Sequence, residues 1–276
     1  MNLKRLMPAV AAGAIVLPSA AFAGTGSVIY GLDLRAENQF FTTTTDDFIG
    51  NFSDIAFDVQ YDSFALDMTL DALTMYAVRW DGGTTTEYGT IDIATGAYNA
   101  LGLISGPAQG SNVSGLSVDP ITGDWYMSTS DTLWRGDIST GTFEAVGLFG
   151  GGALIIDIAI DSQGNAYGHD INGDVLTSIN LATGESTAIG ATGMAANFAQ
   201  GMDFDYSTDM LYATVYTGGG TGGFGTFDLA TGAFNMLQDT AVLNIEAEMA
   251  VGVAIPAPGA LAMIGLGLLG GRRRRG

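Results

Sequence analysis

Asp92-Ile93-Ala94-Thr95-Gly96 is a five-residue stretch that recurs along this chain, each time ending in Gly or Thr-Gly. The later copies are Asp137-Ile138-Ser139-Thr140-Gly141, Asn180-Leu181-Ala182-Thr183-Gly184 and Asp228-Leu229-Ala230-Thr231-Gly232, and a degenerate copy stands earlier as Asp46-Asp47-Phe48-Ile49-Gly50. The five glycines are separated by 46, 45, 43 and 48 residues. A period of this length indicates repeated structural units.

The residues of the repeated stretch are typical of a tight turn. An Asp or Asn at its start can accept hydrogen bonds from backbone N–H groups ahead of it, and glycine adopts positive φ where the chain reverses. A second landmark has the same period, because a tyrosine lies in a short strand-like run of every unit. These tyrosines are Tyr30, Tyr76, Tyr126, Tyr167 and Tyr212.

Each unit reads as four short strands. In the third unit they are predicted at Gly115–Val118, Trp125–Thr129, Thr132–Gly136 and Thr142–Val146. Strand-like runs alternate with turn signals, and no stretch of the body has sustained helical periodicity. Five such units predict an all-β fold, a β-propeller of five four-stranded blades. A β-sandwich is the alternative, and an extra strand within Asp54–Ala65 would allow six blades.

The first unit begins at its second strand, Val28–Leu34, so its innermost strand is missing from the start of the chain. A suitable strand stands at the other end, Glu248–Ala254. Pairing the two would close the ring and remove its exposed edges. We therefore predict a propeller domain over residues 24–255 that is closed by its C-terminal strand.

The charge of this domain limits its partners. All 29 acidic residues of the chain lie within it, against Arg35, Arg79 and Arg135 as the basic residues, which gives a formal charge of −26. Phosphate backbones are bound by basic surfaces, so nucleic acid is excluded as an expected partner. The acidity favours solubility outside the cell, or else divalent-cation binding that bridges to anionic polysaccharide. The chain has no cysteine, which excludes thiol catalysis and disulfides.

Several carboxylates fall in or beside the predicted innermost strands, which line the channel of a propeller. They are Asp67, Asp157 and Asp203, with Asp119, Asp161 and Asp205 at the start of the turns that follow those strands. Converging carboxylates are the ligands that Ca²⁺ prefers, so a Ca²⁺ site at Asp67, Asp203, Asp119, Asp161 or Asp205 is one prediction. The other is that Asp119, Asp161 and Asp205 cap their turns.

Other polar and aromatic residues favour structural roles. The single histidine, His169, stands before Asp170-Ile171-Asn172-Gly173-Asp174 and is expected on a surface turn. That acidic stretch departs from the EF-hand spacing and reads as a hairpin turn, with Ca²⁺ binding as the alternative. Trp80, Trp125 and Trp134 are expected to pack between blades, although tryptophan also stacks on sugar rings.

The N-terminus has the order of parts of a secretory signal peptide. Lys4 and Arg5 precede the apolar run Ala9–Leu17, and Ala21-Phe22-Ala23 supplies a small-x-small cleavage pattern. Cleavage by signal peptidase is expected after Ala23, so residues 1–23 would be removed and the mature chain would begin at Gly24.

The C-terminus, residues 256–276, consists of Pro256-Ala257-Pro258, the apolar run Ala260–Gly271 and Arg272-Arg273-Arg274-Arg275. The run predicts a short apolar helix, shorter than the roughly 20 residues that span a bilayer comfortably, and the arginines would stay on the cytoplasmic side. An ordinary C-terminal anchor or a disordered tail is the plain interpretation.

The stretch also resembles the PEP-CTERM sorting signal, with Ala257 where that family has Glu. The resemblance implies recognition by an exosortase, a membrane transpeptidase-like enzyme of Gram-negative bacteria that make extracellular polysaccharide.

Together these features predict an exported protein, held transiently in the inner membrane by its tail and then placed at the cell surface or in the exopolysaccharide matrix. We expect a non-catalytic binding or structural module whose partners are exopolysaccharide or surface proteins. The alternative is a metal-assisted propeller hydrolase or lyase that acts on extracellular glycans or lactones.

Overall fold

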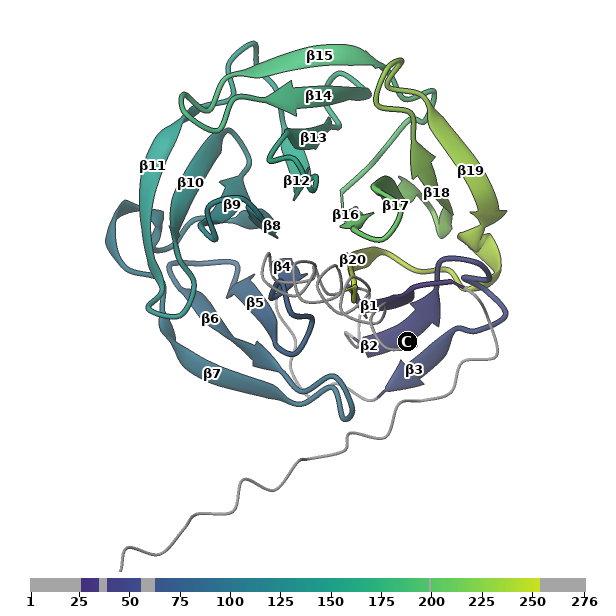
Figure 1. Cartoon of the computed structure of the whole chain (residues 1–276), viewed down its shortest axis with the longest axis horizontal. Helices are drawn as coiled ribbons and strands as arrows, with labels where there is room; N and C mark the ends of the chain where they lie inside the picture. Colours follow the sequence, from purple (N-terminus) through teal and green to yellow (C-terminus); the bar gives the residue numbers. More distant parts are fainter. Residues whose placement is uncertain (1–25, 35–38, 56–62, 199, 254–276) are drawn as a thin grey trace, which may run out of the picture.

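A computed structural model describes residues 26–34, 39–55, 63–198 and 200–253, and these form a ring of five four-stranded antiparallel sheets (Figure 1). The chain is therefore a five-bladed β-propeller, as the repeat predicts. The predicted signal peptide, its cleavage site, the short apolar helix and the sorting residues lie outside the described residues. No helix in the described ranges is long and apolar enough to cross a membrane.

The blades are numbered here in chain order, with their strands given from the channel outward. Blade 1 contains β20 (Ala247–Val251), β1 (Val28–Asp33), β2 (Gln39–Thr44) and β3 (Ser53–Ile55), and blade 2 contains β4 (Ser63–Met68), β5 (Met75–Trp80), β6 (Thr86–Ile91) and β7 (Tyr98–Leu103). Blade 3 contains β8 (Val113–Val118), β9 (Trp125–Thr129), β10 (Thr132–Asp137) and β11 (Thr142–Leu148), and blade 4 contains β12 (Ile155–Ile160), β13 (Ala166–Asp170), β14 (Val175–Ile179) and β15 (Ser186–Ala191). Blade 5 contains β16 (Gly201–Asp205), β17 (Met210–Gly218), β18 (Thr221–Phe227) and β19 (Phe234–Asp239), and the 3₁₀ turns η1 (Gly106–Ala108) and η2 (Thr240–Val242) precede β8 and β20.

The ring is closed as predicted, by pairing of the last strand with the first. β20 lies antiparallel to β1, with Ile29 opposite Val251. A further contact joins blade 5 to blade 1 on the outside of the ring, where Gln238 on β19 bonds the degenerate turn of blade 1. Its Oε1 accepts from the Ile49 N–H at 3.1 Å, and its Nε2 donates to Asp47 Oδ1 at 2.9 Å.

The Thr-Gly turns join the third and fourth strands of their blades, and they hold neighbouring blades together. Gly96, Gly141, Gly184 and Gly232 all have positive φ, between 66° and 81°. A Cβ on Gly141 would lie 2.2 Å from the ring of Tyr88 in the preceding blade, and one on Gly232 would lie 2.4 Å from Gly190 O. Glycine is therefore required both by the backbone conformation and by the close approach of the preceding blade.

The hydrophobic core consists of layers between adjacent blades. Between blades 2 and 3, Trp125 and Trp134 are each 7% exposed and pack with Val78 and Tyr88. The half-buried Trp80 packs against the same layer, and its indole N–H donates to Gly83 O at 3.1 Å. The prediction that the tryptophans pack between blades is confirmed.

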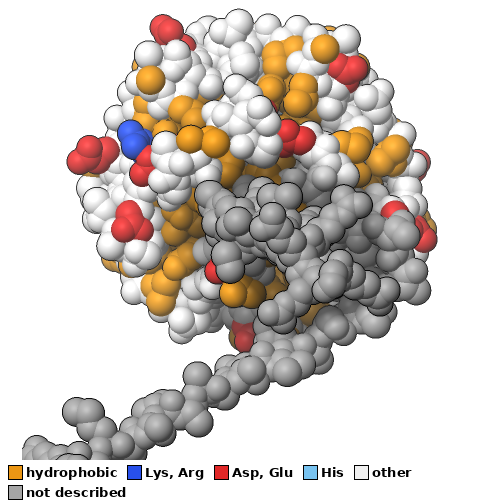
Figure 2. Space-filling view, in the orientation of Figure 1, with side chains coloured by type: hydrophobic (Ala, Val, Ile, Leu, Met, Phe, Trp, Pro, Cys, Tyr) orange, Lys and Arg blue, Asp and Glu red, His pale blue; other side chains and the backbone are white. Residues whose placement is uncertain are grey.

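The two faces of the ring differ. The antiparallel order of the strands places the connections between first and second strands, and the Thr-Gly turns, on one face, which we call the turn face. The opposite face carries longer and irregular connections, including Ile104–Asn112, Phe149–Leu154 and Thr240–Glu246. On the face seen in Figure 2, acidic side chains are scattered around the ring and apolar side chains gather between them.

Candidate functional site

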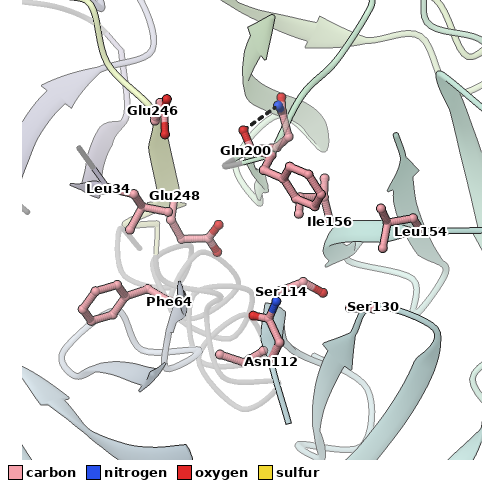
Figure 3. Close-up of a pocket in the computed structure, with 12 residues that line it drawn as sticks. Leu34, Phe64, Asn112, Ser114, Ser130, Leu154, Ile156, Gln200, Glu246 and Glu248 are labelled. Carbon is pink, nitrogen blue, oxygen red and sulfur yellow. Dashed lines mark hydrogen bonds between the residues drawn. The ribbon is translucent and has the colours of Figure 1, made fainter. Parts of the chain in front are cut away.

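The innermost strands β4, β8, β12, β16 and β20 surround the central channel and all run in the same direction. A cavity of about 220 Å³ opens where these strands begin, on the face opposite the turn face (Figure 3). We call it the mouth pocket. It is lined by Leu34, Phe64, Asn112, Val113, Ser114, Ser130, Leu154, Ile156, Phe198, Gln200, Glu246 and Glu248.

Much of the polar lining of the mouth pocket is occupied in hydrogen bonds within and between blades. Gln200 is 2% exposed, and its amide donates to and accepts from the backbone of Tyr216 at 2.9 Å in each direction. Ser114 Oγ donates to Ile155 O at 2.8 Å and so joins blade 3 to blade 4. By contrast, Phe198 is 60% exposed at the rim and makes an apolar surface available to a ligand.

Glu248 forms part of the floor of the mouth pocket. It is 2% exposed, and its Oε1 accepts a long hydrogen bond of 3.4 Å from the backbone N–H of Leu66. Figure 3 shows its carboxyl group directed away from β20 and into the pocket. The sequence predicts Glu248 in the closing strand but indicates no functional role for it, because a single Glu in a strand has no motif around it.

Three aspartates lie deeper in the channel, where the sequence analysis expected them. Each accepts one hydrogen bond from the N–H of its own next residue and one from an inner strand of the following blade. The second bonds join Asp67 to Val118 N at 2.9 Å, Asp157 to Met202 N at 2.5 Å and Asp203 to Val251 N at 2.6 Å. Together with the bond from Glu248 to Leu66, they cross four of the five blade boundaries, and Ser114 crosses the remaining one.

Burial controls the ionisation of this set, Asp67, Asp157, Asp203 and Glu248, which we call the channel carboxyls. It raises the pKa of Asp67 to about 7, and it raises the pKa values of Asp157, Asp203 and Glu248 well above their usual range. The negative charge of Asp67 raises the last three pKa values further. In the described part of the chain, Arg79 and Arg135 form their ion pairs elsewhere, with Glu87 and Asp124.

The aspartates at the other end of the channel cap turns. Asp119 accepts from Ile121 N at 2.9 Å, Asp161 accepts from Asn165 N at 2.8 Å, and Asp205 accepts from Ser207 N at 2.9 Å. They are 3–5% exposed. Within the described ranges no three acidic or histidine side chains are arranged to hold a metal ion. The geometry supports the capping role, and Ca²⁺ binding at these residues stays a prediction.

The expectation that His169 lies on a surface turn is wrong. It lies in β13, is 1% exposed, and its ring contacts Phe227 edge-on at 5.3 Å. The turn begins only after Asp170, whose Oδ1 accepts from Leu154 N and Asn172 N at 2.9 Å. Burial lowers the pKa of His169 to about 4, so the ring is neutral at physiological pH.

The comparisons with known proteins bear on the fold alone. No family model and no curated protein matches this sequence. A chain of a nidogen–laminin complex is similar in structure, with a TM-score of 0.52 and 10% identity over 83% of this chain and 99% of that chain. TolB from Acinetobacter baumannii has a TM-score of 0.48 and 14% identity over 77% of this chain and 53% of its own, so this chain spans about half of it. A regucalcin from Agrobacterium tumefaciens has a TM-score of 0.44 and 9% identity over 66% of each chain. The likeness to the first of these shows a shared β-propeller fold.

Proposed function

We propose that this protein is an exported, non-catalytic binding module of the cell surface or exopolysaccharide matrix. In this proposal the N-terminal signal directs export, and an exosortase-like enzyme removes the tail after the ring. The sequence supports it through the signal-peptide pattern and through Pro256-Ala257-Pro258 with its apolar run and terminal arginines.

The observation that carries the binding role is the difference between the two faces of the ring. The turn face is built from repeated turns whose Asp and Asn side chains cap their own backbone, as Asp92 and Asp228 do. The opposite face carries the irregular connections, the mouth pocket and the exposed Phe198. Binding residues are expected on loops that differ from one repeat to the next and that a rigid scaffold holds in place.

The channel carboxyls support a structural interpretation over a catalytic one. Asp67, Asp157 and Asp203 each use both carboxyl oxygens to accept backbone hydrogen bonds, and one of these bonds crosses a blade boundary. A general acid or base must instead reach the substrate proton. These three residues are therefore assigned to holding the blades together.

A binding experiment tests the role of the pocket face. The mature protein, purified from its host, is titrated with the host's exopolysaccharide and with extracted surface proteins. Binding to one of them is expected, and Phe198→Ala should weaken it. Ile121→Ala is the matched control, because Ile121 is 65% exposed on the turn face and Phe198 is 60% exposed on the pocket face. An equal loss of affinity in both variants, the absence of binding, or turnover of a glycan or lactone would contradict the proposal.

Mass spectrometry of the mature protein from its host tests the sorting route. The expected chain begins at Gly24 and ends at or beyond Ile255, without Arg272–Arg275. Replacing the four arginines by glutamine should leave the chain unprocessed. A surface protein that retains its arginines would contradict processing of the tail, whatever the result of the binding experiment.

A further inference from the structure

We propose that the mouth pocket binds a primary ammonium group carried on a short apolar stem, with Glu248 as its counter-ion. The inference rests on the binding role proposed above and names the ligand chemistry of the same site. It starts from the carboxyl group of Glu248 at the floor of the pocket, where only one of the two carboxyl oxygens accepts a hydrogen bond from the described residues.

The second oxygen of Glu248 is available to a ligand. Oε1 accepts from Leu66 N at 3.4 Å, while Oε2 has no donor among the described residues. The side chain is 98% buried in the protein, since its exposed fraction is 2%, and its carboxyl group points into the pocket (Figure 3). Within the described ranges Oε2 lacks a donor yet is not sealed from the pocket, so a ligand N–H can reach it and donate a hydrogen bond.

The walls of the pocket fit a small, partly apolar ligand. Half of its lining residues are apolar, among them Phe64, Leu154 and Phe198. Its volume of about 220 Å³ lies below the roughly 300–1,000 Å³ of pockets that take drug-sized molecules. Aromatic rings also attract cations over their faces. The pocket therefore fits an ammonium group on a stem the size of one aromatic or aliphatic side chain.

The charge around the pocket selects a cation over an anion. Glu246 lies at the rim and its carboxyl group pairs with the hydroxyl of Tyr216. The negative charges that act on Glu248 from neighbouring inner strands belong to Asp157, Asp67 and Asp203. The acidic body attracts cations over a longer range. An anionic ligand would be repelled by the acidic body, and by the channel carboxyls wherever these are ionised.

Ligand binding should release a proton. Burial, and then the charges of Asp157, Asp67 and Asp203, raise the pKa of Glu248 well above its usual range, which favours the protonated form of this carboxyl group in the free protein. An ammonium ligand favours the ionised form. The balanced step is that the protonated Glu248 and R–NH₃⁺ give the Glu248 carboxylate paired with R–NH₃⁺, plus one proton released to the solvent.

Calorimetry of the mature protein tests this without any mutation. The probe is phenylethylamine, with 2-phenylethanol as the uncharged control of similar shape and 3-phenylpropionate as the anion. Phenylethylamine should bind at least about tenfold more tightly than either control, as expected for a charge-assisted hydrogen bond in a buried site. Its apparent heat at pH 6.5 should change with the ionisation enthalpy of the buffer, because protons are released. Equal affinity for the alcohol, or heats independent of the buffer, would overturn the proposal.

A conservative variant locates the site. Glu248→Gln keeps an oxygen that can accept from Leu66 N but removes the charge, so it should bind phenylethylamine at least about tenfold more weakly and release no proton. Glu144→Gln is the control, because Glu144 is exposed on the outer strand β11 and should leave binding unchanged. A folded Glu248→Gln protein with unchanged affinity would place the amine elsewhere and overturn the proposal. If that variant does not fold, the buffer and control-ligand measurements on the unmodified protein still decide.

Failure of this inference can be told apart from failure of the proposed function. If the exopolysaccharide or a surface protein binds and requires Phe198, while phenylethylamine does not bind, only the ammonium assignment fails. If phenylethylamine binds through Glu248 and no matrix component binds, the pocket chemistry stands and the matrix role fails.

Discussion

The carboxyl group of Asp67 in blade 2 accepts a hydrogen bond of 2.9 Å from the backbone N–H of Val118 in blade 3. Its other oxygen accepts from the N–H of Met68 in its own strand at 2.6 Å. One side chain therefore links inner strands of two separate sheets that share no backbone ladder. Asp157 and Asp203 repeat this geometry at other boundaries, so the channel carboxyls tie adjacent blades together around the axis of the ring.

Removing the Asp67 carboxyl group should destabilise the folded protein. Asp67→Ala leaves the N–H groups of Met68 and Val118 buried without acceptors, which should lower the free energy of unfolding by about 1–3 kcal/mol. Urea denaturation at pH 5 measures the loss. The control is Asp131→Ala, since Asp131 is exposed and bonds only the hydroxyl of the adjacent Thr132 through its side chain. Equal stability of the two variants would show that the bond between blades contributes little.

The free energy of unfolding should fall as the pH rises above about 4. Burial raises the folded-state pKa of Asp67 to about 7 and raises the pKa values of the other channel carboxyls as well, whereas the unfolded chain titrates near pH 4. Through these groups the folded protein holds more protons than the unfolded chain between about pH 4 and 7 and beyond. The contribution of the channel carboxyls to stability is therefore fully present below this window and is lost as the pH rises through it. Urea denaturation at pH 4.5, 6 and 8 should give progressively lower values. Rising stability over that range would contradict the ionisation described for the channel.

Exposed turn aspartates should limit stability on the acid side. Hydrogen bonds lower the pKa values of Asp47, Asp71, Asp81, Asp92 and Asp228. Their contribution is present above their unfolded pKa near 4 and is lost as the pH falls further. The pH of maximum stability should therefore lie near 4, and the same denaturation series extended to pH 2.5 would locate it.

Replacing a glycine of the Thr-Gly turns between third and fourth strands should lower the free energy of unfolding more than replacing a glycine with similar φ that faces open space. Gly232 and Gly123 have φ values of 79° and 77°, but a Cβ on Gly123 would meet nothing within 4 Å, while one on Gly232 would lie 2.4 Å from Gly190 O. Gly123→Ala should cost about 1–2 kcal/mol for the left-handed backbone alone, and Gly232→Ala about 1–3 kcal/mol more for the clash. Equal unfolding midpoints in thermal melts would show that the turn does not need this close approach.

The single histidine should titrate near pH 4. Burial is the main cause that lowers the pKa of His169 to about 4, and the charges of Asp174 and Asp170 oppose it in part. Because the chain has one histidine, its imidazole resonances in a proton NMR titration are assigned without ambiguity. The folded-state pKa is lowered, so this residue reduces stability as the pH falls from about 6.5 to 4, opposite to the channel carboxyls. His169→Phe should therefore steepen the loss of stability with rising pH, and a titration at pH 6.5 would place the ring in solvent.

The ring could be predicted because its determinants are local and repeated. Each Thr-Gly turn depends on the backbone freedom of one glycine and the capping oxygen of one Asp or Asn, which are visible in five residues. The predicted strand Trp125–Thr129 coincides with β9, and the closing strand was found from the missing partner of Val28–Leu34. The possible sixth blade is corrected by the described sheets, which number five.

The site was less predictable because its residues act across blade boundaries. Asp67, Asp157 and Asp203 were placed in the channel, yet their bonds depend on how two sheets without a shared ladder are set against each other, and no spacing encodes that. Glu248 belongs to the pocket only because the last strand completes the first blade. His169 was misplaced because its polar neighbours resemble a turn that starts one residue after Asp170.

Closure by β20 has a consequence for how the chain acquires its structure. β1 forms near the start of the chain, but its inner partner is among the last described residues, with Ile29 opposite Val251. Until that distant segment is present, β1 keeps an open edge, and the boundary between blades 5 and 1 lacks the contacts that β20 makes with β16. Contacts this remote in sequence form slowly. The full ring is therefore completed only after nearly the whole domain has been synthesised.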